Sequence, residues 1–105
     1  MLSDGLVNLY TRDIEAGIRF YRDLLGLDET FRTPAEGTPE HVEFRAGGFT
    51  LGLGTVEAAR RVHGIDASPG APAAAALWTD DVDGAYAELE SADGNLVELV
   101  GKRSR

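Results

Sequence analysis

One sequence pattern occurs twice in the chain and constrains its fold more than any other feature. The pattern Thr-x-Asp-aliphatic-acid-small-small runs from Thr11 to Gly17 and again from Thr79 to Ala85, a shift of 68 residues. The same shift places Tyr10 on Trp78. Repetition at a fixed spacing indicates an internal duplication. The alternative is a chance likeness between two acidic helix starts, because Asp suits the N-terminus of any helix.

A chain of 105 residues has room for one compact domain, so two duplicated halves must share it. We expect a single domain over residues 1–105, with a first module at 1–56, a connecting helix and linker at 57–72 and a second module at 73–101.

Charge and composition narrow the classes of partner. The 18 acidic and 10 basic side chains give a net charge of −8, which disfavours nucleic acid and anionic membrane surfaces and favours a cationic ligand. The chain has no cysteine, so disulfides and thiolate zinc sites are excluded. Neither a leader-like N-terminus nor a long apolar run is present, so we expect a cytoplasmic protein.

Hydrophobic periodicity predicts a β-α-β-β-β order in the first half. A helix is expected between Asp13, as the N-terminal cap, and Gly26, as a left-handed stop. Its apolar stripe consists of Ile14, Ile18, Tyr21 and Leu25. Strands are expected at residues 6–10, 27–32, 41–45 and 49–54, with Gly47-Gly48 as a hairpin signal.

The secondary structure of the second half is predicted partly from the repeated pattern. A short helix capped by Thr55 should end near His63, followed by a linker at residues 65–72. The repeat predicts a strand at 73–78, a helix capped by Asp81 that carries Val82, Tyr86 and Leu89 on one stripe, and a final strand at 95–100.

A segment of the repeat is missing from the second half. Residues 48–53 align with residues 94–99 at a shift of 46, whereas the helices align at 68, so about 22 residues are absent near Ala92 and Asp93. Either the second half is truly shortened, or a segment is absent from the printed sequence. We favour the second explanation because losing two central strands would leave exposed sheet edges and too little core.

Three segments together resemble a known family. The stretch DIEAGIRFYRDLLGL, the later DDVDGAYAEL and the closing DGNLVELV look like the vicinal oxygen chelate superfamily, which includes glyoxalases, bleomycin-resistance proteins, fosfomycin-resistance transferases and extradiol dioxygenases. The resemblance implies an α+β fold, in which two βαβββ modules with curved mixed sheets surround a cavity. It also implies homodimers and, in the enzymes, a divalent metal in that cavity.

The metal positions implied by the resemblance mostly lack ligands here. The first falls on Leu6, the second on Gly52 and the third on Ala74, and only the last matches, at Glu98. Three of these four residues have no side-chain donor, and one carboxylate does not hold a divalent ion. We therefore expect no metal and no cofactor, and whether the chain is an enzyme stays open.

Alternation along the strands then predicts which side chains face the cavity. The inward sets are Leu6, Asn8 and Tyr10; His41, Glu43 and Arg45; Thr50, Gly52 and Gly54; Ala74, Ala76 and Trp78; and Leu96, Glu98 and Val100. The alternate residues should pack beneath the helices, namely Val7, Leu9, Leu51, Leu53, Ala75, Leu77, Val97 and Leu99. The candidate ligand-binding residues are Asn8, Tyr10, Glu43, Arg45, Thr50, Gly52, Trp78 and Glu98.

Purely structural explanations exist for several of these residues. Tyr10 and Trp78 can fill core volume, and Gly52 and Gly54 can let a curved strand bend. Glu98 can pair with Arg45. His41 can be a surface histidine near a loop, and His63 a cation or neutral group at a helix end.

Two functions follow from this pattern. The first is a metal-free binding dimer of the bleomycin-resistance type that sequesters a small aromatic or cationic molecule. The second is a glyoxalase-like lyase or a dioxygenase with a metal in a rearranged site from His41, Glu43 and Glu98. A ligandless accessory dimer is a third possibility.

Overall fold

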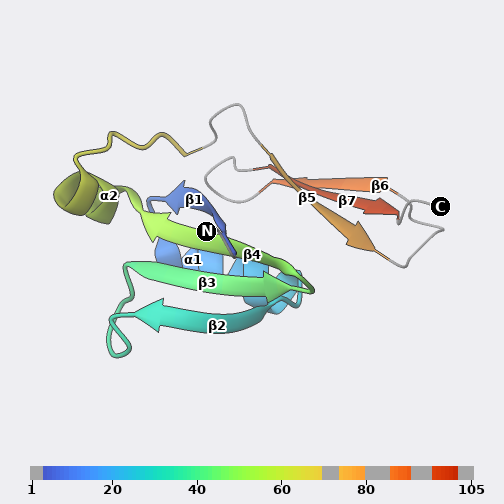
Figure 1. Ribbon diagram of the computed structural model, residues 1–105, viewed down its shortest axis with the longest axis horizontal. Helices are drawn as coiled ribbons and strands as arrows, with labels where there is room; N and C mark the ends of the chain where they lie inside the picture. Colours follow the sequence, from blue (N-terminus) through green and yellow to red (C-terminus); the bar gives the residue numbers. More distant parts are fainter. Residues whose placement is uncertain (1–3, 70–73, 80–85, 91–95, 102–105) are drawn as a thin grey trace. The chain divides into compact units, whose positions relative to one another are not determined.

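The computed structural model describes residues 4–69 and the backbone of residues 74–79, 86–90 and 96–101 (Figure 1). The chain divides into two compact units, Met1–Pro69 and Gly70–Arg105. Within the described residues, no helix is long and apolar enough to cross a membrane.

The first unit follows the β-α-β-β-β order that the sequence predicts. Its elements are β1 (Val7–Thr11), α1 (Ile14–Ile18), the π-helix η1 (Arg19–Leu24), β2 (Asp28–Thr33), β3 (His41–Ala46), β4 (Phe49–Thr55) and α2 (Val56–His63). The predicted strands are thus confirmed to within one residue at each end. The single predicted helix is realised as α1 and η1 in direct succession.

The helix ends use the residues that the sequence indicates. The Asp13 side chain accepts a hydrogen bond of 3.1 Å from the Ala16 N–H and so caps α1. Gly26 has φ +73°, a left-handed conformation that favours glycine after a helix. Thr55 is both the last residue of β4 and the cap of α2, so no linker separates this strand from its helix.

The four strands of the first unit form one sheet in the order β1-β4-β3-β2. β1 runs parallel to β4, and the other neighbours are antiparallel. Ala46 pairs with Phe49 across the Gly47-Gly48 turn, which confirms the predicted hairpin. Figure 1 shows α1 lying across one face of this sheet.

The core lies on the face of the sheet that α1 covers. Val42 and Phe44 of β3 are fully buried, and Leu51 and Leu53 of β4 are nearly so. They pack with Ile14, Ile18 and Tyr21, and the Tyr21 and Phe44 ring centroids are 5.7 Å apart. The alternation predicted for β3 and β4 is therefore confirmed. Val7, which was expected beneath the helix, is instead 49% exposed, because it begins an edge strand.

The second unit contains a three-stranded sheet in the order β5-β7-β6. Its strands are β5 (Ala74–Thr79), β6 (Tyr86–Glu90) and β7 (Leu96–Gly101), and β5 runs parallel to β7. The register repeats that of the first unit. Val7 pairs with Leu51 in the first sheet, and Ala75, 68 residues after Val7, pairs with Val97, 46 residues after Leu51. Both sequence shifts therefore fit a single strand register.

The helix predicted from Asp81 through Leu89 is wrong over its second half. Residues Tyr86–Glu90 form β6, which pairs antiparallel with β7 and so occupies the place that β3 has beside β4. A strand here satisfies the backbone groups along the second edge of β7, which a helix would leave unpaired. Asp81 and Val82, as well as the expected break between Ala92 and Asp93, lie outside the described residues.

Candidate functional site

The sheet face opposite α1 has two buried glycines on β4, and three side chains gather above the first of them. A β-carbon on Gly52 would collide with Asn8 Oδ1, and it would lie 3.0 Å from Leu6 Cδ1 and 3.1 Å from His41 Cε1. Contacts this close are not tolerated without movement. Only glycine at this position lets Asn8 and His41 approach each other over the strand.

Two rings lie over the second glycine. A β-carbon on Gly54 would be 3.6 Å from Cδ1 and Cε1 of Tyr10 and 3.8 Å from Nδ1 of His41. The Tyr10 ring and the Nδ1 edge of the His41 ring therefore face the same space above β4.

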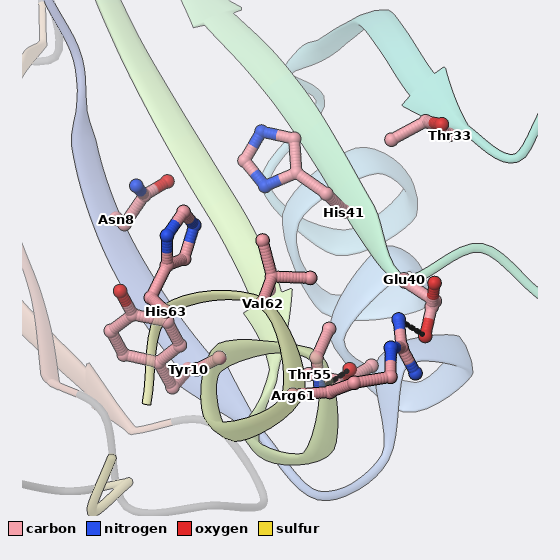
Figure 2. A pocket seen from close by; sticks show the side chains of 12 residues that line it. Asn8, Tyr10, Thr33, Glu40, His41, Thr55, Arg61, Val62 and His63 are labelled. Carbon is pink, nitrogen blue, oxygen red and sulfur yellow. Dashed lines mark hydrogen bonds and ion pairs between the residues drawn. The ribbon is translucent and has the colours of Figure 1, made fainter. Parts of the chain in front are cut away.

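This space belongs to a cavity of about 340 Å³ beneath α2. Figure 2 shows side chains from β1, β3 and α2 converging on it, with His63 between Asn8 and Val62. Its lining consists of Asn8, Tyr10, Thr33, Glu40, His41, Gly54, Thr55, Ala58, Ala59, Arg61, Val62 and His63.

Two side-chain hydrogen bonds fix the position of α2, which forms one wall of the cavity. The Thr55 hydroxyl accepts a hydrogen bond of 3.1 Å from the Ala58 N–H at the start of the helix. Near its end, Arg61 donates to Glu40 at 2.6 Å, which connects α2 to the residue before β3 (Figure 2). These contacts hold α2 over Gly52 and Gly54 of β4, which together form the glycine floor of the cavity. The second contact also pairs the Arg61 guanidinium with the Glu40 carboxylate.

A histidine and a glutamate of β3 form a pair on the cavity face. His41 Nε2 lies 3.0 Å from Glu43 Oε2, and both side chains are about one quarter exposed. The Phe31 ring of β2 flanks His41 with a centroid separation of 6.4 Å. His41 thus has one ring nitrogen occupied by a carboxylate and the other turned to the cavity.

The predicted site residues of the first unit fall into three groups. Asn8 and Tyr10 line the cavity. Gly52 lies under the Asn8 side chain, and Glu43 forms a hydrogen bond with His41. Arg45 and Thr50 lie near the β3–β4 turn, where Arg45 donates to the Thr50 hydroxyl at 3.1 Å and to the Gly47 carbonyl at 3.0 Å. The structure therefore does not bring Arg45 and Thr50 to the cavity.

The other two predicted residues belong to the second unit. Trp78 is on β5 and pairs in register with Val100, and Glu98 is on β7 and pairs with Ala76. Their side chains lie outside the part of the chain that the structure describes.

Sequence reasoning missed the contribution of α2. His63 was expected to be only a helix-end group, yet it lines the cavity together with Arg61 and Val62. A signal was present, because Ala58, Ala59 and Val62 recur at helical spacing right after a strand that ends in its own helix cap. Such a helix turns sharply from the sheet and can cover the end of its face.

Among the described residues, the groups with shifted pKa values lie on the outer strand β2 and on η1, and none of them lines the cavity. A hydrogen bond from Arg32 lowers the pKa of Glu29, and one from Arg22 lowers the pKa of Asp23. The same carboxylates raise the pKa of the two arginines. These ion pairs lie outside the cavity lining.

The family's usual metal positions do not fit an ion in this chain. Leu6 and Gly52 have no donor atoms in their side chains, and a Leu6 methyl group lies beside the position where a side chain at 52 would begin. Among the described residues, no group of three His, Asp or Glu side chains is arranged to hold a metal. The donor chemistry at these positions therefore disagrees with a metal of the family type.

The mixed α+β fold agrees with a family model that matches nearly the whole chain. Residues 5–103 match the model of the Glyoxalase/Bleomycin resistance protein/Dioxygenase superfamily, so the chain is a member of it. A search of curated proteins finds no matching sequence.

Solved structures confirm the fold. The hypothetical protein SA1046 from S. aureus has a TM-score of 0.74 and 16% identity, over 97% of this chain and 95% of that one. The antibiotic binding protein TnmS3 from Streptomyces sp. CB03234 has a TM-score of 0.69 and 18% identity, over 98% of both chains. A bleomycin-binding protein solved with bleomycin has a TM-score of 0.61 and 17% identity, over 97% of this chain and 100% of that one.

Proposed function

We propose that the chain is a metal-free binding protein of the bleomycin-resistance kind. It holds a small aromatic or cationic molecule in the cavity beneath α2 and acts as a homodimer in the cytoplasm. The observation that carries the proposal is the glycine floor of β4, above which the rings of Tyr10 and His41 stand. Two rings beside a flat backbone surface can stack on a planar ligand.

The size and polarity of the cavity support this function. A volume of about 340 Å³ lies in the range of small-molecule sites, which span roughly 300–1,000 Å³. The lining combines apolar groups, such as Ala59 and Val62, with a few directional polar groups, such as Asn8 and His41. A ligand would gain from apolar burial and be oriented by the polar groups.

The absence of donors at three of the four family positions supports binding without a metal. Leu6, Gly52 and Ala74 have no side-chain lone pairs, which leaves Glu98 alone. The net charge of −8 further favours a cationic ligand over an anionic one.

The proposal also includes the organisation of the chain. We take residues 1–56 and 73–101 as two related modules of one domain, joined by α2 and a linker at 57–72, with about 22 residues absent near Ala92 and Asp93. The matched register of the two sheets supports the relation between the modules. Trp78 and Glu98 remain predicted ligand contacts from the second module.

Calorimetric titration tests the binding function. Bleomycin and a set of planar aromatic cations are titrated into the wild-type protein and into two variants. We expect binding by at least one compound, a loss of about tenfold or more in Tyr10→Ala, and no loss in Phe20→Ala, a control ring that packs on Tyr21 outside the cavity lining. No heat with any compound, or equal affinity in both variants, would contradict the proposal.

The oligomeric state is measured separately by light scattering after size exclusion. We expect a mass of twice the chain mass at micromolar concentrations. A monomer at all concentrations would contradict the homodimer.

A metal-dependent lyase or dioxygenase is the second candidate function. The close approach of His41 and Glu43 favours it, because an imidazole and a carboxylate are common ligands of catalytic metals. Elemental analysis of the purified protein separates the two functions. Metal well below one ion per chain supports the binding protein, whereas one ion per chain that is lost in His41→Ala supports the enzyme.

A further inference from the structure

We propose that Glu43 fixes His41 as a hydrogen-bond acceptor, which makes the cavity selective for aromatic molecules with a hydroxyl or N–H donor, such as phenols. This inference rests on the proposed binding function and deepens it by naming the ligand class. It follows from three features of the cavity.

The first feature is the geometry of the pair. His41 and Glu43 are two residues apart on β3, so both side chains are on the same face of the sheet. The Nε2 to Oε2 distance of 3.0 Å is that of a good hydrogen bond. A carboxylate only accepts, so the proton of a neutral imidazole is on Nε2, and Nδ1 keeps its lone pair.

The second feature is the direction of Nδ1. This atom lies 3.8 Å from the position of a β-carbon on Gly54, and it faces the cavity over the same strand residue as the Tyr10 ring. In Figure 2 the ring of His41 projects from β3 toward the side of the pocket where Asn8 and His63 lie. The acceptor is therefore directed at a ligand that lies on the glycine floor.

The third feature is that three other polar side chains of the lining already have partners. Glu40 and Arg61 bind each other at 2.6 Å, and the Thr55 hydroxyl accepts from the Ala58 N–H. A ligand hydroxyl directed at His41 Nδ1 completes a chain from ligand to imidazole to carboxylate. A ligand without a donor leaves a buried acceptor unsatisfied, which weakens its binding.

The test compares 2-naphthol with 2-methoxynaphthalene, which has the same ring system but no hydroxyl proton. Affinities are measured by calorimetry at about pH 8. We expect wild type to prefer 2-naphthol by about tenfold. The preference should disappear in His41→Leu. It should fall in Glu43→Ala, and also in Glu43→Gln, because an amide can donate to Nε2 as well as accept from it and so no longer fixes the tautomer. Circular dichroism verifies that each variant is folded.

Imidazole ¹⁵N spectra give a readout that a purely structural role of Glu43 would not change. We expect His41 in the Nε2–H tautomer in wild type, a shift of its Nδ1 signal on addition of 2-naphthol, and mixed tautomers in Glu43→Ala. An Nδ1–H tautomer in wild type would overturn the inference.

The outcomes separate this inference from the function on which it rests. Equal affinity of wild type for both probes, with shifts of the cavity amides, overturns the donor selectivity and leaves the binding function standing. Failure of both probes, of bleomycin and of the aromatic cations to bind overturns both.

Discussion

The two faces of strands β3 and β4 are built from alternating residues of the same segments, yet they have opposite properties. On one face Val42, Phe44 and Leu53 are buried against α1. On the other, His41, Glu43 and Gly54 leave a polar hollow that α2 covers. If the proposed function is right, this sheet keeps the residues for stability on one face and the residues for binding on the other. Substitutions on the core face should cost folding free energy, and substitutions on the cavity face should cost binding.

The largest expected contrast is between two residues of β3 that lie on opposite faces of the sheet. Phe44→Ala removes a fully buried ring and should lower the free energy of unfolding by about 3–5 kcal/mol. His41→Ala, on the opposite face and about one quarter exposed, should change it by less than about 1 kcal/mol. Urea denaturation measures both. A large cost for His41→Ala would show that the cavity face is also core.

Alanine substitutions at two glycines, one on each side of the sheet, should also differ in their effect on stability. A β-carbon at Gly17 would collide with Leu53 Cδ2. Leu53 is only 1% exposed, so its displacement disturbs the core and Gly17→Ala should lose about 1–2 kcal/mol even with a gain in helix propensity. At Gly52 the colliding atom belongs to Asn8, which is exposed and can rotate away. Gly52→Ala should therefore leave stability nearly unchanged.

The same Gly52→Ala variant should weaken ligand binding by about tenfold, since Asn8 can no longer lie over β4. Thermal unfolding and calorimetry provide the two measurements. If Gly17→Ala loses binding without losing stability, the division between the faces is wrong.

Removing the two helix caps should have similar effects on stability but different effects on ligand binding. Asp13→Ala and Thr55→Ala each remove a side-chain acceptor at a helix start and should each cost about 1 kcal/mol. Only Thr55→Ala should also lower ligand affinity, because α2 forms the cavity wall and α1 does not. Equal binding by the two variants would indicate that α2 has no part in the site.

The smallest effect concerns the outer strand. Glu29→Gln removes the ion pair with Arg32, at 2.7 Å, and should cost about 0.5 kcal/mol near neutral pH without changing binding. The pKa of Glu29 is lowered in the folded state by the hydrogen bond from Arg32. Its contribution is therefore present above the ordinary glutamate pKa of about 4.3 and is lost as pH falls through the lowered pKa. Denaturation of both proteins across this range should show the difference vanish in acid.

The predictable parts of this molecule are those governed by local pattern. The strands of the first unit, the caps Asp13 and Thr55 and the stop at Gly26 follow from alternation and end signals, and the structure confirms them. The core residues Val42 and Phe44 follow from the same alternation.

The errors have tertiary causes. Tyr86–Glu90 was predicted as helix from the repeat, but pairing with β7 decides its conformation, and propensity does not reveal that pairing. His63 and Val62 join the site only because α2 turns over the sheet end, which depends on the direct succession of β4 and α2. The pairing of Arg45 with Thr50 likewise required the hairpin geometry.

Amide chemical-shift mapping with the tightest-binding compound of the titration set tests the central claim most directly. We predict that the largest ¹H–¹⁵N shift changes fall on the cavity lining, at Tyr10, His41, Gly54 and Val62, while Ile18 and Phe44 on the core face change little. Saturable binding with its largest changes on η1 or β2, and none at Gly54, would contradict it.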